Sequence, residues 1–492
     1  MANPLKQLAG ETAIYGMSTI LARIVNFMLV PLYTRVLTQS DYGVVTEFMA
    51  YIAILQVVLT LGLETGCFRF ASKDGVDKEK VFSNAFALVL GTCLIFFTAV
   101  AAFSGQISAA LGYEGFRNII IYVAAILLMD NTTAIIFARL RYEHKALKFA
   151  VIKTLKIFTE VGANLVLYLA MPKRFAANPD HWLLNFVSAT PDFSYAIFAI
   201  FLSCILCTIL LLPDILHLRF RADGKLWKEL LLYSLPLMIA GLPGVLNDFL
   251  DRVLMRFLNA DPVMWRADLG VYQAGVKIAV IMSLFIQMFR YAAEPFFFQR
   301  QKEKGSKELY AKVMNYFVAF CMFAFLFVML YMDEIGLLLG KDFRPGLSIA
   351  PVMLMAYLVL GMLFNVNMWY KLSGKTGYAI WVTLAGLVVT ILVNAIFMPR
   401  FSYHAAAWGH LASYTAMLII STLLGNKYYN IPYKWGVIAL LIIFGLGIWG
   451  LSMLLPEMGM WPKLAVHTLL ILAYLAVVGA MIILSRRRAA KA

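Results

Sequence analysis

The sequence predicts an all-α membrane protein with about fourteen transmembrane helices. Of its 492 residues, 62% are hydrophobic and 14% are charged, and the mean hydropathy is +0.80. Soluble domains are about 45–50% apolar and about 25% charged, so this composition excludes that class. The apolar runs lack the alternation of a membrane β-barrel. Because backbone polar groups in lipid must be satisfied internally, each span is predicted to be a helix.

Fourteen apolar stretches have about the 20 residues that a helix needs to cross the hydrocarbon core. In chain order they cover residues 12–36, 43–68, 81–104, 119–139, 150–171, 194–213, 229–257, 269–297, 311–331, 347–369, 379–398, 404–425, 436–455 and 464–484. The loops between them are short, which leaves no room for a soluble domain on either face of the membrane.

Lysine and arginine are distributed unevenly between the two sides of these spans. The termini and every second loop hold roughly 24 of them, and the other loops hold roughly 9. By the positive-inside rule, both termini are expected in the cytoplasm. The net charge of +15 therefore reflects membrane topology and does not indicate a nucleic-acid partner.

Two segments indicate an internal repeat, TRVLTQSDYGVV at 34–45 and MRFLNADPVMWRADLGVY at 255–272. Each has an Arg-x-Leu helix end, a polar outer loop and Asp-x-Gly-Val in the next helix. Parallel repeats are typical of transporters that bind substrate between the halves. The alternative is a chance recurrence of Asp-x-Gly, a common loop-to-helix signal. We expect six-helix bundles over 1–214 and 215–426, and a final helix pair with a basic tail over 427–492.

Polar side chains inside the spans are concentrated in the first two helices of each proposed half. A charge at bilayer mid-depth costs about 2.5–3.5 kcal/mol on insertion scales, so such residues normally face a wet cavity. The candidate substrate-binding residues are Arg23, Asn26, Arg252, Lys277 and Arg290, and the candidate coupling or cavity carboxylates are Glu64, Asp248 and Asp251.

Cations dominate this set. Asp248–Arg252 has the i,i+4 spacing of a helical ion pair, and so does Arg290 with Glu294. These four side chains can therefore satisfy one another locally.

Arg23 and Lys277 are then the least obviously paired residues. Unpaired basic groups in a low-dielectric cavity bind anions, and guanidinium geometry suits phosphate or pyrophosphate. The alternative is that each cation is paired across helices and only holds the bundle together. Arg256 lies close to the outer interface and is expected to snorkel toward water.

Titratable residues also lie in spans 4 and 5. Lys153, Lys156 and Glu160 open span 5, where they are expected to anchor the cytoplasmic end, with Lys156 pairing to Glu160. Contact with a substrate phosphate is the alternative. Asp130 and Asn131, in the middle of span 4, either relay a proton or hydrogen-bond a neighbouring helix.

Two further features of the spans concern packing and bending. The C-x-x-C of Cys204 and Cys207 lies within an apolar run without a neighbouring acid, which is typical of small packing residues. Span 7 contains Pro236 and Pro243, so its inner half is expected to be kinked or locally unwound.

No catalytic or cofactor-binding motif is recognised. The histidines are scattered, and no H-E-x-x-H, G-x-S-x-G or Walker-type sequence occurs. We therefore predict a transporter without metal or cofactor, not an enzyme, driven by an H+ or Na+ gradient, by the membrane potential or by the substrate gradient. Glu64 and Asp248 are the first candidates for ion coupling.

Several short motifs together resemble a known family. They are Arg23 with the Pro31-Leu32-Tyr33-x-Arg35 helix end and Asp41-Tyr42-Gly43, then Gly62-Leu63-Glu64 with Arg69-Phe70, and Gly340-Lys341-x-Phe343 in an outer loop. This set resembles the Wzx-type polysaccharide flippases, which move polyprenyl-pyrophosphate-linked oligosaccharides, in the superfamily of multidrug, oligosaccharidyl-lipid and polysaccharide exporters. The resemblance implies twelve core helices in two bundles, alternating access and a bacterial inner-membrane location. It also implies that Arg23, Arg252 and Lys277 hold the pyrophosphate.

The predicted function is export of a lipid-linked oligosaccharide for cell-surface polysaccharide, such as the O-antigen of lipopolysaccharide. Membrane lipids surround it, and a polysaccharide polymerase and glycosyltransferases are its expected neighbours. A drug or cation antiporter of the same fold is one alternative, but it requires uncompensated cavity carboxylates. A membrane polysaccharide polymerase is the other, and it requires a large outer loop with catalytic Arg or His. The longest outer loop, 172–193, offers only Lys173, Arg174 and His181.

Overall fold

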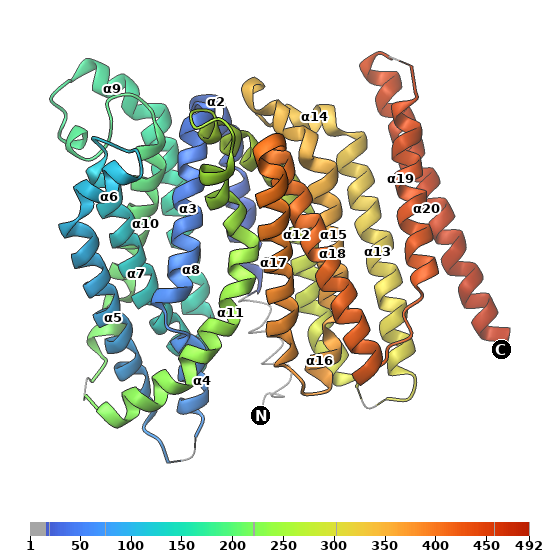
Figure 1. Ribbon diagram of the computed structural model, residues 1–492, viewed down its shortest axis with the longest axis horizontal. Coiled ribbons are helices and arrows are strands. Elements are labelled where there is room, and N and C mark those ends of the chain that lie inside the picture. The colour runs from blue at the N-terminus through green and yellow to red at the C-terminus, as the bar shows by residue number, and fades with distance from the viewer. Residues whose placement is uncertain are drawn as a thin grey trace. The chain divides into compact units, whose positions relative to one another are not determined.

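The structure is a computed structural model that describes residues 16–491, apart from 19, 74, 220–221, 302 and 457; the side chains of 295, 482 and 484–491 also lie outside it. Within this part every regular element is a helix (Figure 1), which confirms the predicted all-α class. The backbone of the basic tail continues α20, but the side chains counted there for topology are among those not described.

A helical segment from Gly16 leads into the first labelled helix. Up to residue 216 the elements are α2 (Val30–Val36), α3 (Gln39–Leu59), α4 (Leu63–Ala71), α5 (Lys78–Ala102), α6 (Ser104–Ala110), α7 (Arg117–Tyr142), α8 (Ala146–Leu165), the π-helical turn η1 (Val166–Ala170), α9 (Met171–Ala177), the 3-10 turn η2 (Trp182–Asn185) and α10 (Phe193–Leu216). The later elements are α11 (Gly224–Leu258), α12 (Trp265–Gln299), α13 (Ser306–Leu330), α14 (Met332–Gly336), the 3-10 segment η3 (Lys341–Ile349), α15 (Ala350–Val366), α16 (Met368–Leu372), α17 (Tyr378–Phe401), α18 (Tyr403–Tyr428), α19 (Trp435–Met453) and α20 (Met460–Lys491).

Thirteen helical segments of the described chain are long and apolar enough to cross a membrane. The predicted span 150–171 is not among them, although it forms α8 and the π-helical turn that follows. Four charged residues lie along α8: Lys148, Lys153, Lys156 and Glu160. These charges lower its apolarity, so α8 depends on its contacts with α7 and α10.

The chain forms two compact units, Met1–Gly270 and Val271–Ala492. In the first unit, α7 packs against α5 and α10, α8 packs on α10, and α11 lies along α3 and α4. The boundary between the units falls inside α12, because α11 packs on helices that precede it. The division into six-helix bundles at residues 214 and 215 stays a prediction.

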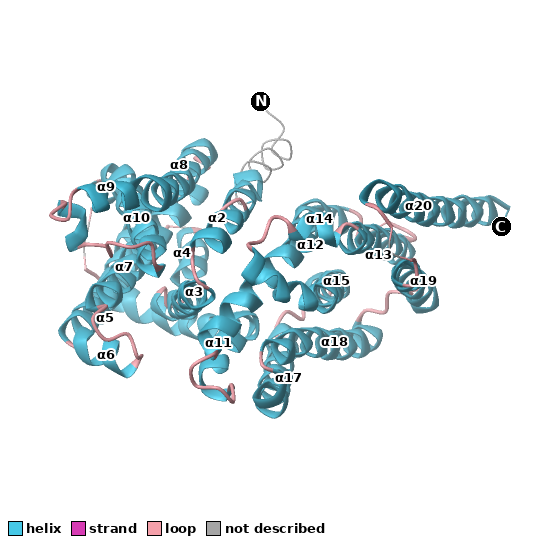
Figure 2. Cartoon of the chain, turned by 90° about the horizontal axis from the view of Figure 1, so that it is seen from above, coloured by secondary structure: helices cyan, strands magenta, loops and turns pink. Residues whose placement is uncertain are grey.

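In the second unit, α18 packs against α15 and α17, and α13 packs against α15. The last two helices, α19 and α20, lie along α13 (Figure 2). An apolar cluster includes Phe297 of α12, Tyr310 of α13 and Ile431 of the loop before α19. The Tyr310 hydroxyl donates to the Phe297 carbonyl oxygen at 2.7 Å, so the polar tip of this buried ring is satisfied.

The two segments of the predicted repeat have matching local structure. Thr38 precedes α3, and its hydroxyl donates to Asp41 Oδ2 at 2.6 Å. Asn259 follows α11, and its amide donates to Asp268 Oδ2 at 2.8 Å. In each case a polar residue of the loop holds the aspartate of the Asp-x-Gly-Val motif.

The glycines of the two motifs make a reciprocal contact within the first unit. A Cβ on Gly43 would lie 1.8 Å from the carbonyl oxygen of Arg266, and a Cβ on Gly270 would lie 2.0 Å from that of Gln39. Each of these carbonyls belongs to the residue four positions before the other glycine. Only glycine allows backbones to approach so closely. This symmetry favours a true repeat over a chance recurrence of Asp-x-Gly.

Candidate functional site

A buried ion pair joins α3 to α11. Glu47 is completely buried, and its Oε1 accepts hydrogen bonds from the Tyr51 hydroxyl at 2.6 Å and Arg256 Nη1 at 2.9 Å. Its Oε2 accepts a hydrogen bond from the Tyr113 hydroxyl. Arg256 Nη2 also donates to the Ala110 carbonyl oxygen at 3.2 Å. Both oxygens of the carboxylate are therefore bonded.

The prediction that Arg256 snorkels toward water is wrong, because its side chain is only 14% exposed and pairs with Glu47. Arg266 adds a second cation beside this cluster, 4.7 Å from the centre of the Tyr113 ring. Its Nη2 donates to the Gly112 carbonyl oxygen at 3.1 Å. The partners Glu47 and Arg256 are 209 residues apart, so no local spacing signals their pairing.

Span 2 is interrupted about two-thirds of the way along, between α3 and α4. Leu61 and Gly62 have φ angles of 53° and 68°, in the left-handed region. Gly62 adopts this conformation readily, and a Cβ there would lie 2.5 Å from the Ser234 carbonyl oxygen of α11. Glycine therefore serves both the turn and the close approach of α11.

Of the two forms predicted for span 7, kinked or locally unwound, the structure excludes the unwound one, because α11 is helical throughout, including Pro236 and Pro243. The unwound turn lies in span 2 instead. Just after it, Glu64 stands in the first turn of α4, and its Oε2 accepts a hydrogen bond from Arg141 Nη2 of α7 at 3.0 Å. Both side chains are about two-fifths exposed, 41% for Glu64 and 37% for Arg141.

Arg252 and Asp251 are both buried on α11. Arg252 Nη1 donates to the backbone carbonyl oxygen of Asp248 at 2.5 Å and lies 3.7 Å from Asp251 Oδ1. Its guanidinium also lies 4.9 Å from the centre of the Phe249 ring. The side chain of Asp248 is exposed. The structure thus brings three predicted site residues together within α11.

Arg23 and Asn26 lie in the helical segment before α3. Arg23 is exposed, and no residue that the structure describes forms an ion pair with it. Asn26 is half-buried, and its Oδ1 is buried without a hydrogen-bond partner in the same part of the chain. Within a membrane-length helix, an exposed guanidinium requires water, a headgroup or an anion as its partner.

Lys277 and Arg290 lie on α12 in the second unit. Lys277 is half-buried and has an interaction partner, so the expectation that it is unpaired is not met. Arg290 is exposed, with Nε 3.9 Å from Glu294 Oε2, the pair that the i,i+4 spacing predicts. Lys371 holds Glu294 more closely, at 2.5 Å, and the Arg290 guanidinium lies 5.1 Å from the Phe364 ring centre.

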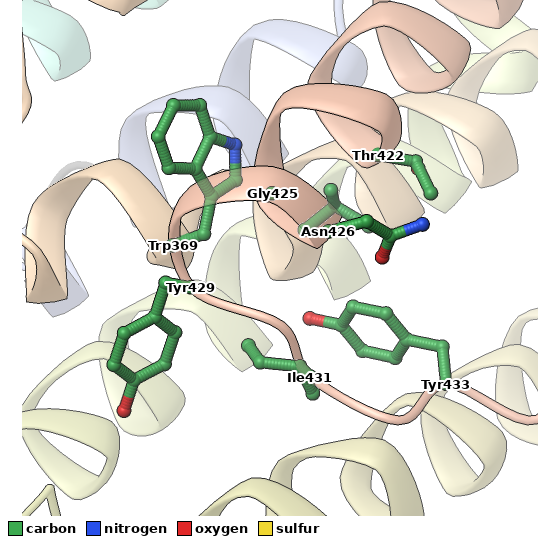
Figure 3. Close-up of a pocket in the computed structure, with 8 residues that line it drawn as sticks. Trp369, Thr422, Gly425, Asn426, Tyr429, Ile431 and Tyr433 are labelled. Carbon is green, nitrogen blue, oxygen red and sulfur yellow. The ribbon is translucent and has the colours of Figure 1, made fainter.

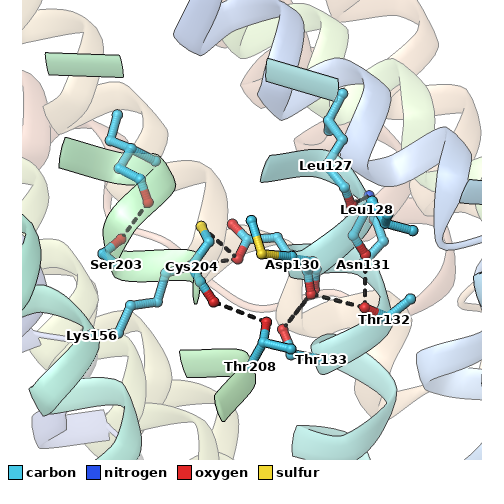
Figure 4. Close-up of polar contacts among 12 residues, drawn as sticks. Leu127, Leu128, Asp130, Asn131, Thr132, Thr133, Lys156, Ser203, Cys204 and Thr208 are labelled. Atoms are coloured by element: carbon cyan, nitrogen blue, oxygen red, sulfur yellow. Dashed lines mark hydrogen bonds and ion pairs between the residues drawn. The ribbon is translucent and has the colours of Figure 1, made fainter. Parts of the chain in front are cut away.

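A partly buried ion pair joins α7 to α8 (Figure 4). Lys156 Nζ lies 2.5 Å from Asp130 Oδ1, and Cys204 Sγ of α10 donates to the same oxygen at 3.3 Å. The side chains of Asp130 and Lys156 are 17% and 16% exposed. Lys156 therefore pairs with Asp130 in place of the expected Glu160, and its burial does not fit an interfacial anchor. Cys204 therefore has an acidic neighbour in the structure, Asp130, although no acidic residue lies beside it in the sequence.

The residues beside this pair differ in how they are satisfied. Asn131 Nδ2 donates to the Leu127 carbonyl oxygen of its own helix at 2.6 Å. Lys153 lies one turn before Lys156, with Nζ 4.2 Å from the centre of the Phe137 ring. The sequence identifies Asp130 as a mid-span carboxylate, but it does not identify the lysine that pairs with it.

A small pocket of about 180 Å³ lies beside α18 in the second unit (Figure 3). Its lining residues are Val366, Trp369, Thr422, Gly425, Asn426, Tyr429, Ile431 and Tyr433. Trp369 Nε1 donates to Ser421 Oγ at 3.0 Å, and the Tyr433 hydroxyl donates to the Asn365 carbonyl oxygen at 3.2 Å. These polar groups are already bonded, and none of the predicted site residues lines the pocket.

Comparison with known proteins decides the family. Residues 8–301 match the family described as Polysaccharide biosynthesis protein. The chain belongs to this family. This polysaccharide biosynthesis protein is also 20% identical to a protein of the Lsg locus of Haemophilus influenzae (strain Rd), over 306 residues that make up 60% of the chain and 67% of that relative.

Solved structures share the fold of this polysaccharide biosynthesis protein. The lipid II flippase MurJ, in an inward closed conformation, matches with a TM-score of 0.67 at 13% identity, over 95% of this chain and 99% of MurJ. An inward-facing MATE multidrug transporter of the MOP superfamily matches with a TM-score of 0.62 at 12% identity, over 88% and 96% of the chains. The protein is therefore a multi-pass membrane protein with a MOP-type transporter fold. The two solved structures are of a flippase and a transporter. The predicted resemblance to the polysaccharide-exporter family is confirmed.

Proposed function

We propose that the protein is a flippase that moves polyprenyl-pyrophosphate-linked oligosaccharides across the inner membrane of a bacterium, with both termini in the cytoplasm. The oligosaccharide head would enter from the cytoplasm while the polyprenyl tail stays in lipid, and rocking of the two predicted bundles would release it outside. The product would serve a cell-surface polysaccharide such as O-antigen, beside glycosyltransferases and a polymerase. Family membership supports the link to polysaccharide biosynthesis.

The observation that carries this proposal is the exposed guanidinium of Arg23 in a membrane-length helix. An arginine at such a depth is costly unless it meets water or an anion. A pyrophosphate matches the planar, bidentate geometry of a guanidinium. We also propose Asn26, Arg252, Lys277 and Arg290 as substrate-binding residues, and Glu64, Asp248 and Asp251 as the coupling or cavity carboxylates.

A drug or cation antiporter is the second candidate, since MATE transporters have the same fold. Cation transport needs carboxylates that lack basic partners. Here Glu64 accepts a hydrogen bond from Arg141, and Asp251 lies 3.7 Å from Arg252. The pairing of these two acids supports the anionic substrate.

The test follows a fluorescent polyprenyl-pyrophosphate disaccharide between the leaflets of liposomes that contain the full-length protein. We expect Arg23→Ala to slow exchange at least about tenfold, because a lost charge-assisted hydrogen bond costs about 1.5–3 kcal/mol. Lys277→Ala should act in the same direction. Arg300→Ala is the matched control, since it removes a half-exposed arginine that pairs with Glu303.

Full exchange by both Arg23→Ala and Lys277→Ala would contradict the proposal. Efflux of a cationic dye by the wild type, unaffected by these substitutions and abolished by Asp251→Asn, would favour the antiporter instead.

A further inference from the structure

The Asp130–Lys156 pair lies at the centre of its helices. Asp130 stands midway along the 26 residues of α7, Lys156 midway along the 20 residues of α8, and Cys204 midway along the 24 residues of α10. At a rise of 1.5 Å per residue, these positions are about 13–20 Å from the helix ends. The charges therefore lie at the depth where fixed charges are most costly and where proton relays occur in transporters.

The pair is incompletely bonded. Lys156 and Cys204 both contact Oδ1 of Asp130, and Oδ2 accepts no hydrogen bond from any residue that the structure describes. Lys156 uses one N–H in this contact, and the described chain offers no acceptor for the other two. The Lys153 ammonium lies 4.2 Å from the centre of the Phe137 ring. One carboxylate thus faces two ammonium groups, a net charge of +1.

The surrounding groups come from three helices. From α8, Lys153 lies one turn from Lys156; from α10, Cys204 and Cys207 face the pair. From α4, Glu64 acts on Lys153, but this acid is itself held by Arg141. None of these groups supplies a second full negative charge to the site.

A metal cation does not suit this arrangement. The Lys156 ammonium already occupies the position beside Asp130 Oδ1, and the one remaining oxygen, Oδ2, does not supply the several oxygen ligands that a metal cation needs. A proton, in contrast, needs only a lone pair, and Oδ2 of Asp130 offers one.

We propose that Asp130 binds a proton on Oδ2 during transport and that this binding couples the first unit to a proton gradient. The proposal rests on the proposed transport function and names a coupling carboxylate other than Glu64 and Asp248. In the binding step, a hydronium ion transfers its proton to Oδ2, an O–H bond forms, and water leaves. Lys156 keeps its own protons but loses its ionic partner.

Protonation changes the charge of the site from +1 to +2. Lys156 and Lys153 then repel each other, with no carboxylate between them in a low-dielectric environment. This repulsion falls if α8 shifts away from α7 or if an anion approaches the lysines. Proton binding is therefore linked to the position of α8, and by reciprocity that position changes the affinity for the proton.

The test places full-length protein in liposomes with the same fluorescent polyprenyl-pyrophosphate disaccharide. It compares the wild type with the Asp130→Asn/Lys156→Gln double variant, which removes both charges together. The matched control is Asp333→Asn/Lys463→Gln, which removes an exposed Asp–Lys pair between α14 and α20.

Without a gradient, all three proteins should exchange the probe, and this arm tests the flippase function alone. With a gradient of about one pH unit, wild type and control should shift the leaflet distribution about tenfold for one coupled proton, since about 1.4 kcal/mol is a factor of ten. The Asp130 double variant should show no shift. A double variant that keeps the shift, or a wild type that exchanges without it, overturns the proposal.

A wild type that does not exchange the probe overturns the flippase function. Protonation of Asp130 can then still be measured directly. Infrared difference spectra recorded on lowering the pH should contain a protonated-carboxyl band that Asp130→Asn lacks and Asp130→Glu restores at a shifted frequency. The same spectra apply if the double variant fails to fold. A band that Asp130→Asn leaves unchanged overturns the proposal.

Discussion

Two carboxylates of the first unit, Glu47 and Asp130, differ in how completely they are bonded. Glu47 has no solvent exposure, and three side chains donate to its two oxygens. Asp130 is 17% exposed, and both of its donors share one oxygen. Movement around Glu47 breaks several hydrogen bonds at once in a low-dielectric environment, whereas the proton proposed for Asp130 binds the oxygen that has no donor among the described residues.

The two carboxylates therefore differ in more than their solvent exposure. The number of unsatisfied lone pairs and the net charge around the pair are more informative. Glu47 is neutralised by Arg256 and hydrogen-bonded by two tyrosines, while Asp130 pairs with Lys156 and has a second lysine, Lys153, one turn away on α8.

The largest expected effect on stability is at Glu47, because both oxygens of its carboxylate accept hydrogen bonds. Glu47→Gln leaves the Arg256 guanidinium buried without a counter-charge, so it should lower the free energy of unfolding by about 3–5 kcal/mol. Reversible unfolding in mixed detergent micelles measures this change. Glu303→Gln is the control, because its pair with Arg300 is half-exposed and removal should cost less than about 1 kcal/mol. Equal losses of unfolding free energy for Glu47→Gln and Glu303→Gln would contradict the special role of the buried pair.

The backbone contact one turn before Glu47 should give the next largest effect. Gly43→Ala places a methyl group against the Arg266 carbonyl oxygen, and overpacking of this kind costs about 1–3 kcal/mol. Gly91→Ala, on α5 with nothing within 4 Å of the new Cβ, should be neutral or slightly stabilising. A Gly43→Ala protein as stable as Gly91→Ala would mean that this end of α3 is loosely packed.

The incompletely bonded pair should contribute less to stability. The Asp130→Asn/Lys156→Gln double variant should unfold within about 1 kcal/mol of the wild type, because removing both charges also removes their desolvation penalty. Asp130→Asn alone should be less stable than the double variant, since Lys156 is then left without its counter-charge. Thermal unfolding of the three proteins ranks them, and a double variant less stable than the single one would mark the pair as a structural element.

The smallest effect is expected at an exposed pair. Lys80 Nζ donates to Asp223 Oδ2 at 2.7 Å, and this contact and the backbone N–H groups of Leu226 and Lys225 lower the pKa of Asp223. A lowered pKa stabilises the fold above the unfolded pKa of about 3.9, and the stabilisation is lost as the pH falls through the folded pKa. Asp223→Asn should therefore lower the melting temperature slightly at pH 6 and have no effect well below pH 4.

Salt distinguishes the two causes of the lowered pKa of Asp223, the contact with Lys80 and the hydrogen bonds from backbone N–H groups. Asp261 also has a lowered pKa, but its causes are hydrogen bonds from the N–H groups of Val263 and Met264. High salt should therefore reduce the effect of Asp223→Asn more than that of Asp261→Asn. Equal salt dependence would exclude a contribution from the lysine.

Composition and hydropathy sufficed for the fold class, because a lipid environment restricts long apolar segments to helices. The motif glycines at 43 and 270 were visible as a repeat, and the structure adds their mutual contact. Ion-pair partners were harder to predict, since spacing along one helix only suggests i,i+4 neighbours. Arg290–Glu294 follows that rule, while Lys156 contacts a residue 26 positions earlier in the chain.

The charges of α8 also affect how the protein enters the bilayer. A helix with Lys153 and Lys156 near its middle inserts poorly by itself, since each central lysine costs about 2.5–3.5 kcal/mol on translocon scales. Asp130 on α7 offsets part of that penalty if the two helices leave the translocon as one hairpin. The short connection from Tyr142 to Ala146 keeps them adjacent during synthesis. The same aspartate would thus assist biogenesis before it takes part in transport.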